Sequence, residues 1–409
     1  MTAVGALIAL GGSLAIAFST DGMGDYRIQM APAVDALSHG ELSEFFRVQP
    51  VYGILTPLLQ APFVALARLG DGSELLDYRL AVLPCLLAVG LIGVQLARVM
   101  VRRGQPAYAC LAVCALPLVN PATFAAIDNG HPEELLAAAL TVAAILAAID
   151  KRTLWAGILL GLALSTKQWA VLAALPVLVA SGRGRATQAA VAAGAVVACM
   201  ALPMAVASPD RFVANARMTE GARVLVSRFS VWWPLSSVER EVVAVGDEAR
   251  PVIRHRLSRQ LTALGRPLIV ILALGLALAW GRRRDSTPAD ALGLLALVFL
   301  LRCVLDPNNN AYYHVPFLLS LLGWEVLTRS GLPVLTLVAA AALWGTFESG
   351  LLAEPAIDNA FYLGWALAIA GWIALSLHAP GPREKLAARL DPGERVAVAG
   401  GPRSIHARK

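Results

Sequence analysis

The chain has 409 residues, of which 57% are hydrophobic and 15% charged, and its formal net charge is +6. An ordinary soluble domain has about 45–50% apolar and about 25% charged residues. This composition excludes a disordered chain, a collagen-like fibre, a coiled coil and a disulfide scaffold. It also argues strongly against a soluble enzyme of this length.

The apolar residues are grouped into runs that are long enough to cross a bilayer, for which a helix needs about 20 residues. Ten runs are clear, and an eleventh, Leu154–Ala180, is interrupted at Lys167 and Gln168, so it is predicted to form two short spans. Because unsatisfied backbone groups in lipid are costly, the spans must be helices. We therefore expect an all-α polytopic membrane protein with about twelve transmembrane helices. The ten clear runs are, in chain order, Val4–Ser19, Leu80–Val99, Tyr108–Ala125, Leu135–Ile149, Ala186–Ala207, Leu261–Trp280, Ala291–Leu305, Tyr312–Leu327, Leu332–Phe347 and Ala360–Leu377.

The basic residues beside the spans predict the orientation, since Lys and Arg favour the cytoplasmic side. They fall on one face if both termini are cytoplasmic and if Val51–Leu69 is a half-buried external helix rather than a span. The protein is then a multi-pass plasma-membrane protein with its opposite face extracytoplasmic. The residues placed in the cytoplasm include Arg98, Arg102, Arg103, Lys151, Arg152, Arg183, Arg185, Arg282, Arg283, Arg284 and Arg329.

The predicted organisation is one transmembrane domain at residues 1–380, followed by a flexible basic cytoplasmic tail at 381–409. Two outer loops, 20–77 and 208–260, are longer than a simple connection. In the first loop, Ile28–Phe46 places its apolar residues on one helical stripe, which predicts amphipathic helices lying in the membrane interface. The second loop is rich in arginine.

The first polar motif on the outer face is STDGMGDYR at 19–27, which carries Asp21 and Asp25 directly after the first helix. A carboxylate in a partly desolvated cleft can take a proton from a hydroxyl nucleophile. The alternative is ordinary turn chemistry, because Asp and Gly are common turn residues.

The second motif is DNGHPEE at 128–134. Glu133 and Glu134 suit the positive N-terminal end of a helix, which is a structural explanation. The helix start does not account for Asp128 and His131, which lie directly before it. A metal site of Asp128, His131 and Glu134 is possible but not expected, because it lacks an HExxH-like pair, and no cofactor is predicted.

The third motif, around Lys167, and the fourth motif, from Arg302 to His314, place basic side chains on the same outer face. Lys167 interrupts an apolar run, where a charge costs about 2.5–3.5 kcal/mol. It is either a cation for an anionic group such as phosphate or a member of a buried ion pair with outer carboxylates. Arg302 and His314 bracket the turn of residues 306–311, and His314 is either a satisfied interfacial histidine or a group that meets a phosphate.

A cavity with carboxylates, a cation, a histidine and aromatic residues suits transfer chemistry on a lipid-linked phosphate. A different class, a lipid or glycan transporter or flippase, stays open, although such proteins usually bind near the bilayer midplane in repeated halves. No nucleic-acid partner is predicted, and the oligomeric state is open.

These motifs resemble the C-type (GT-C) superfamily of membrane glycosyltransferases. They are most similar to family 87, the polyprenyl-phosphate-mannose-dependent mannosyltransferases, which act in the synthesis of bacterial cell-envelope glycans. The matching segments are GDYR at 24–27, YGILTPLLQAP at 52–62, GHPEE at 130–134, GLALSTKQW at 161–169 and DPNNNAYYH at 306–314.

The resemblance implies a GT-C-like fold and an inverting transfer of a hexose, mannose in the family, from a polyprenyl-phosphate sugar to a lipid or glycan hydroxyl on the outer face. It implies Asp25 as the catalytic base, with Asp21 second. Its implied substrate-binding set has Lys167, His314 and Arg302 near the phosphate and His131 and Glu134 near sugar hydroxyls, and Asp128 and Gln168 complete it.

Overall fold

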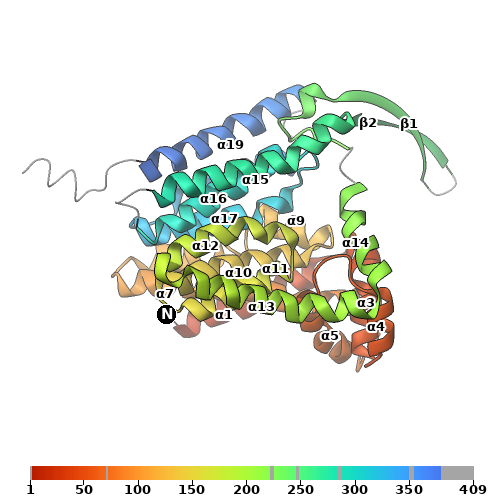
Figure 1. Cartoon of the computed structure of the whole chain (residues 1–409), viewed down its shortest axis with the longest axis horizontal. Helices are drawn as coiled ribbons and strands as arrows, with labels where there is room; N and C mark the ends of the chain where they lie inside the picture. Colours follow the sequence, from red (N-terminus) through yellow and green to blue (C-terminus); the bar gives the residue numbers. More distant parts are fainter. Residues whose placement is uncertain are drawn as a thin grey trace, which may run out of the picture.

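The computed structural model describes residues 2–70, 72–221, 225–245, 248–282, 287–349 and 354–378 (Figure 1). The predicted basic tail at 381–409 lies outside these ranges. Most of the described chain is helical, which confirms the predominantly helical fold that the sequence predicts. The number of spans stays a prediction. Within the described residues, five helices are long and apolar enough to cross a membrane by themselves, and other apolar helices are shorter. The helices of the bundle are α1 (Thr2–Ser19), α7 (Leu83–Arg102), α8 (Ala107–Ala115), α9 (Pro121–Asp128), α10 (Pro132–Ile149), α11 (Thr153–Leu164), α12 (Ala174–Ser181), α13 (Arg183–Ala207), α15 (Arg259–Gly281), α16 (Asp290–Leu305), α17 (Val315–Thr328), α18 (Val334–Phe347) and α19 (Pro355–His378).

Helix α10 is the centre of the bundle. Its apolar residues occur all round the helix, and 78% of it is buried, whereas only 22% of the apolar window of α13 is buried. A helix that is hydrophobic on every face is stable only when other helices or lipid cover it. Helices α7, α11 and α17 pack directly against α10. The polar residues at the start of α10 are therefore held on a rigid central element.

The apolar run at 154–180 is broken at Lys167, as predicted, because α11 ends at Leu164 and α12 begins at Ala174. A Cβ at Gly157 would contact the carbonyl oxygen of Ala189, and one at Gly161 would contact that of Ala193. The second contact lies four residues later than the first on both helices, so α11 and α13 run parallel to each other. The chain between them must therefore turn back, and Lys167 lies at that turn.

The first outer loop forms short helices at the end of the bundle opposite the N-terminus (Figure 1). The single stripe predicted for Ile28–Phe46 is divided, because Gly40, at φ +76°, turns the chain between two helices. Helix α5 has 13 residues and measures about 20 Å at 1.5 Å per residue. That length is short of a bilayer core, in keeping with the external helix predicted there. The helices of this loop are α2 (Tyr26–Gln29), α3 (Ala31–Ser38), α4 (Leu42–Val48), α5 (Leu55–Ala67) and α6 (Glu74–Ala81).

The second outer loop corrects the all-α prediction, because it contains an antiparallel hairpin of β1 (Ser237–Val245) and β2 (Glu248–Arg256) after α14 (Pro209–Gly221). The sequence predicts an arginine-rich loop in this segment. In the hairpin they pair across the strands, with Arg256 Nε 2.9 Å from a Glu239 carboxylate oxygen and Arg254 Nε 3.2 Å from one of Glu241. Opposite charges on neighbouring strands stabilise such a pair of strands.

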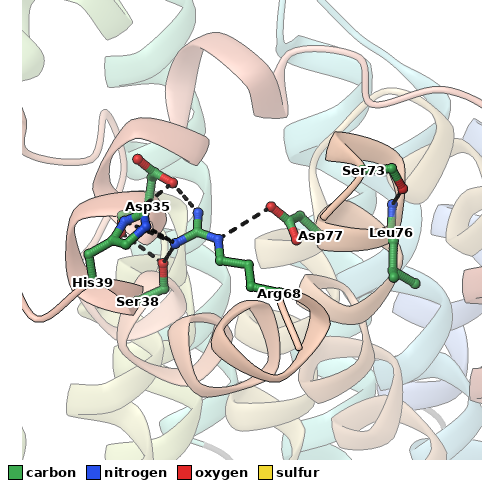
Figure 2. A network of polar contacts seen from close by, with 7 residues as sticks. All are labelled: Asp35, Ser38, His39, Arg68, Ser73, Leu76 and Asp77. Carbon is green, nitrogen blue, oxygen red and sulfur yellow. Dashed lines mark hydrogen bonds and ion pairs between the residues drawn. The ribbon is translucent and has the colours of Figure 1, made fainter. Parts of the chain in front are cut away.

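Arg68, just after α5, links the helices of the first outer loop, as Figure 2 shows. Its guanidinium pairs with the carboxylate of Asp35 and donates to the hydroxyl of Ser38, both on α3. Its Nε lies 3.7 Å from a carboxylate oxygen of Asp77 on α6. The side chain of Arg68 is only 24% exposed. The guanidinium of Arg68 therefore connects α3, α5 and α6.

We expect Arg68→Ala to lower the free energy of unfolding by about 1–2 kcal/mol, because it removes several charge-assisted hydrogen bonds from a partly buried point. The measurement is the thermal unfolding of the full chain in detergent. Arg27→Ala is the matched control, since the Arg27–Glu74 pair is 64% and 74% exposed and such a pair contributes about 0–1 kcal/mol. Equal shifts for the two variants would contradict the linking role of Arg68.

Candidate active site

Two glycines fasten the loop after α1 to the turn before α10. Gly24 and Gly130 have φ of +42° and +76°, a region that favours glycine. A Cβ at Gly24 would lie 2.2 Å from the carbonyl of Asn129, and one at Gly130 would lie 2.3 Å from the carbonyl oxygen of Met23. The amide of Asp25 donates to the Asn129 carbonyl at 3.0 Å. The two loops therefore interlock, and Asp25 lies directly beside the turn.

A chain of three polar side chains leads from the surface into the bundle. Oδ2 of Asp25 lies 3.4 Å from Nε2 of His131, and Nδ1 of His131 lies 3.0 Å from Oε1 of Glu133. The Asp25 side chain is 58% exposed, whereas those of His131 and Glu133 are 4% and 1% exposed. The exposed carboxylate is thus backed by an imidazole and a second, fully buried carboxylate.

The hydrogen positions in this chain follow from the acceptor-only character of a carboxylate. Oε1 of Glu133 also accepts from Nζ of Lys167 at 2.9 Å, so Glu133 is ionised and Nδ1 of His131 must carry a hydrogen. Nε2 of His131 is then the ring nitrogen that faces Asp25, at 3.4 Å. The same oxygen of Asp25 accepts a hydrogen bond from Nε2 of Gln29 at 2.9 Å, so the carboxylate is held from two sides.

Lys167 occupies the centre of the buried network. Its Nζ lies 2.9 Å from Glu133 and 3.2 Å from Glu134, and its side chain is 6% exposed. The backbone of Lys167 is extended between α11 and the 3-10 helix η1 (Gln168–Ala173), which directs the side chain toward the start of α10. These contacts confirm the ion-pair alternative for Lys167. Two carboxylates already neutralise its charge.

Tyr52 covers Lys167 from the first outer loop. The Gly53 amide donates to the carbonyl of Thr166 at 3.2 Å, and a Cβ at Gly53 would lie 1.9 Å from the carbonyl oxygen of Ser165. This close approach brings the Tyr52 ring centroid to 3.1 Å from Nζ of Lys167, a cation–π contact. Burial raises the pKa of the Tyr52 hydroxyl, which therefore stays protonated at neutral pH.

Aromatic rings and one arginine complete the wall of the site. The ring of Tyr312 stacks on His131 at 4.5 Å, and Nε1 of Trp169 donates to Glu134 at 2.7 Å. The guanidinium of Arg302 lies 5.3 Å from the Trp169 ring and 4.6 Å from the Tyr313 ring. Arg302 is buried and forms no ion pair with a carboxylate among the residues that the structure describes. It therefore has donors to offer an anion.

Three other predicted site residues lie outside this network. Asp21 is 94% exposed, with a carboxylate oxygen 3.3 Å from Arg79. Asp128 accepts a hydrogen bond from the hydroxyl of Thr20 at 3.1 Å, and Gln168 is exposed at the start of η1. Their roles stay predictions. The possible metal ligands Asp128, His131 and Glu134 have different partners, and no group of metal-binding side chains is found in the described ranges.

His314 is also separate from the network, in an aromatic cluster. Its Nδ1 faces the carbonyls of Asn310 and Ala311 at 3.2 Å and 3.1 Å, so Nε2 accepts from the hydroxyl of Tyr362 at 3.1 Å. No part of the His314 side chain is exposed. These bonds hold the η4 turn (Ala311–His314), which carries Tyr312, against α19. The structure thus places His314 where it positions the wall of the site.

Glu133, Tyr52 and Trp169 are part of the network but were not among the predicted site residues. The position of Glu133 at a helix N-terminus already explains a carboxylate there, so the sequence shows no further role for it. A signal was available in Lys167, because a buried cation that lacks an opposite charge is strongly destabilising. The nearest pair of carboxylates predicted on the same face is Glu133 and Glu134.

The sequence profile of glycosyltransferase family 87 matches residues 51–307, which is more than half of the chain. The matched range includes His131, Glu133, Glu134, Lys167 and Arg302, and it begins after Asp25. Among curated proteins, none matches the chain in sequence.

We expect Gly130→Ala to lower the midpoint of thermal unfolding more than Gly40→Ala does. Both glycines have φ of +76°, so each alanine adds a backbone strain of about 1 kcal/mol. A Cβ at Gly40 meets no atom within 4 Å, whereas at Gly130 it meets backbone atoms, which must move. Thermal unfolding in detergent measures the difference. Equal midpoints for the two variants would show that the loops do not interlock at Gly130.

Lys167→Met is expected to lower the free energy of unfolding by about 3–5 kcal/mol, because it leaves two buried carboxylates without a cation. Adding Glu133→Gln and Glu134→Gln to this variant removes the unpaired charges and should restore part of the stability. Lys151→Met is the control, since Lys151 is exposed. Chemical denaturation in micelles reports the three values. If Lys167→Met were as stable as the wild-type protein, the carboxylates of Glu133 and Glu134 would be hydrated rather than buried.

Proposed function

Because the chain belongs to glycosyltransferase family 87, we propose that it transfers a sugar, mannose by resemblance, from a polyprenyl-phosphate donor to a hydroxyl group of a lipid or glycan. The observation that carries this proposal is the half-exposed carboxylate of Asp25 in front of the buried His131–Glu133 pair. A general base must be within reach of the substrate, and its partners must hold it in position. Asp25 is the carboxylate of the network that meets the first condition.

In this proposal Asp25 removes the proton from the acceptor hydroxyl as its oxygen bonds to the anomeric carbon. The bond from that carbon to the phosphate oxygen breaks in the same step, which inverts the configuration. The proton passes to Asp25, which the side chains of His131 and Gln29 hold in place. Glu133 keeps the imidazole oriented through its contact with Nδ1.

The phosphate that departs with the lipid carries negative charge, and it needs cations rather than a general acid. Arg302 is the first choice for this contact, because its guanidinium lies in the wall without a carboxylate partner among the described residues. Lys167 contributes through its position, although Glu133 and Glu134 share its charge. The neutral hydroxyl of Tyr52 is an additional donor beside them. This assignment moves the main phosphate contact from Lys167 and His314 to Arg302.

The site is proposed to face the extracytoplasmic side of the plasma membrane. The opposite end of the bundle carries basic residues such as Arg103, which donates to the carbonyls of Val326 and Leu327 at 2.7 Å and 2.8 Å. Basic residues that flank spans favour the cytoplasm. The polar network lies at the other end, with the short helices of the first outer loop.

We expect Asp25→Asn to reduce transfer by about 10²–10⁴-fold, the usual contribution of a general base. The assay follows radiolabelled mannose from a synthetic polyprenyl-phosphate donor into lipid and glycan products in membranes containing the full chain. Asp21→Asn is the matched control, because Asp21 is highly exposed and pairs with Arg79. It should retain most of the activity.

If Asp25→Asn remains active in a folded protein, Asp25 is not the base. If Asp21→Asn alone abolishes transfer, the base is Asp21. If wild-type protein uses glucosyl or galactosyl polyprenyl phosphate but not the mannosyl compound, the sugar assignment is wrong and the reaction class stands. If the donor lipid crosses the bilayer without loss of its sugar, the chain is a transporter.

A further inference from the structure

A cavity of about 270 Å³ lies between α1, α7 and α8, at the end of the bundle opposite the polar network. Its walls include apolar side chains of α7 and α8, among them Val94, Val101 and Leu111, and Gly5 of α1. Leu7 and Tyr108, on the neighbouring turns of α1 and α8, are 69% and 63% exposed. The cavity therefore opens onto a surface that lipid covers in a membrane.

Two arginines of α7, Arg98 and Arg102, line the same cavity. They are four residues apart, so they lie on one face of the helix. Both are exposed, and neither has a carboxylate partner among the residues that the structure describes. Arg103 differs, because its guanidinium caps the end of α17 through the carbonyls of Val326 and Leu327.

Arg98 lies about 6 Å deeper along α7 than Arg102, from four residues at 1.5 Å each. A cation at that depth in a membrane helix is costly unless it extends to the interface or meets an anion. No carboxylate of the described residues supplies such an anion to Arg98 or Arg102, so an anion at this cavity comes from outside that part of the protein. The apolar walls of the cavity favour a molecule that also carries hydrocarbon.

We propose that this cavity binds an anionic phospholipid of the surrounding bilayer. The phosphate lies between the guanidinium groups of Arg98 and Arg102, and the first part of an acyl chain covers Val94 and Leu111. Two guanidinium groups suit a phosphate, since each offers several donors in a planar fork. Basic pockets between membrane helices are a known way to select anionic head groups. This site is independent of the transfer reaction.

The experiment uses the full chain, purified in a non-ionic detergent and depleted of lipid. Native mass spectrometry then counts the lipid retained in titrations with phosphatidylglycerol and with phosphatidylcholine. We expect wild-type protein to bind one phosphatidylglycerol at least about tenfold more tightly than phosphatidylcholine. The double variant Arg98→Gln/Arg102→Gln should lose this preference.

The matched control is Arg152→Gln/Arg183→Gln, which removes two exposed arginines from the same end of the protein but outside the cavity. It should keep the preference. Leu111→Trp is a second variant, which fills the cavity and retains both arginines, and it should weaken the binding of phosphatidylglycerol.

Two results would overturn the proposal. The first is a preference for phosphatidylglycerol that persists in Arg98→Gln/Arg102→Gln. The second is an equal loss in the control pair, which would mean that basic charge attracts lipid without a site. Binding is read without substrate, so neither result bears on the glycosyltransferase proposal.

Discussion

The buried contact of Lys167 with Glu133 and Glu134 is the interaction on which the rest of the site depends. Charges in the interior of a membrane protein are tolerated only when they are paired closely, because each unpaired one costs several kcal/mol. Because of this requirement, the turn after α11, which carries Lys167, must lie beside the start of α10. Glu133 also contacts His131, two residues earlier in the chain, and His131 lies 3.4 Å from Asp25. The hydrogen bond from the Asp25 amide to the Asn129 carbonyl holds the exposed carboxylate at the end of this chain of contacts.

The two ends of the bundle use charge differently. At the end that contains Asp25, opposite charges lie in contact with one another, and the network is shielded by Tyr52, Trp169 and Tyr312. At the other end, Arg103 donates to the carbonyls at the end of α17, and Arg98 and Arg102 line a cavity at the surface. Arg329 at this end lies 3.8 Å from the carboxylate of Glu325, one turn earlier. The first arrangement holds charged side chains against one another inside the bundle, whereas the second leaves Arg98 and Arg102 at the surface.

The helices and the residue types of the site could be predicted from the sequence, because bilayer-length apolar runs and charges within them are strong local signals. Lys167, His131 and Glu134 were expected on one face, and the structure brings them into one network. The roles of Glu133 and Tyr52 depend on contacts between distant segments, and no periodic pattern contains that information. His314 shows the same limit, since its burial comes from Tyr362 on the last described helix. The hairpin at 237–256 was missed because charged residues interrupt its apolar ones and because the segment lies in a loop that the sequence marks mainly by its arginines.

The position of Lys167 also has a consequence for how the chain enters the membrane. Glu133 and Glu134 lie at the start of α10, so during synthesis they emerge before their cation and must wait for the next helical hairpin. At about 5–20 residues per second this interval lasts a few seconds. During that time the start of α10 carries two carboxylates that lipid does not tolerate, and it must stay near water or the insertion machinery. The network can therefore form only after the turn that carries Lys167 has been synthesised.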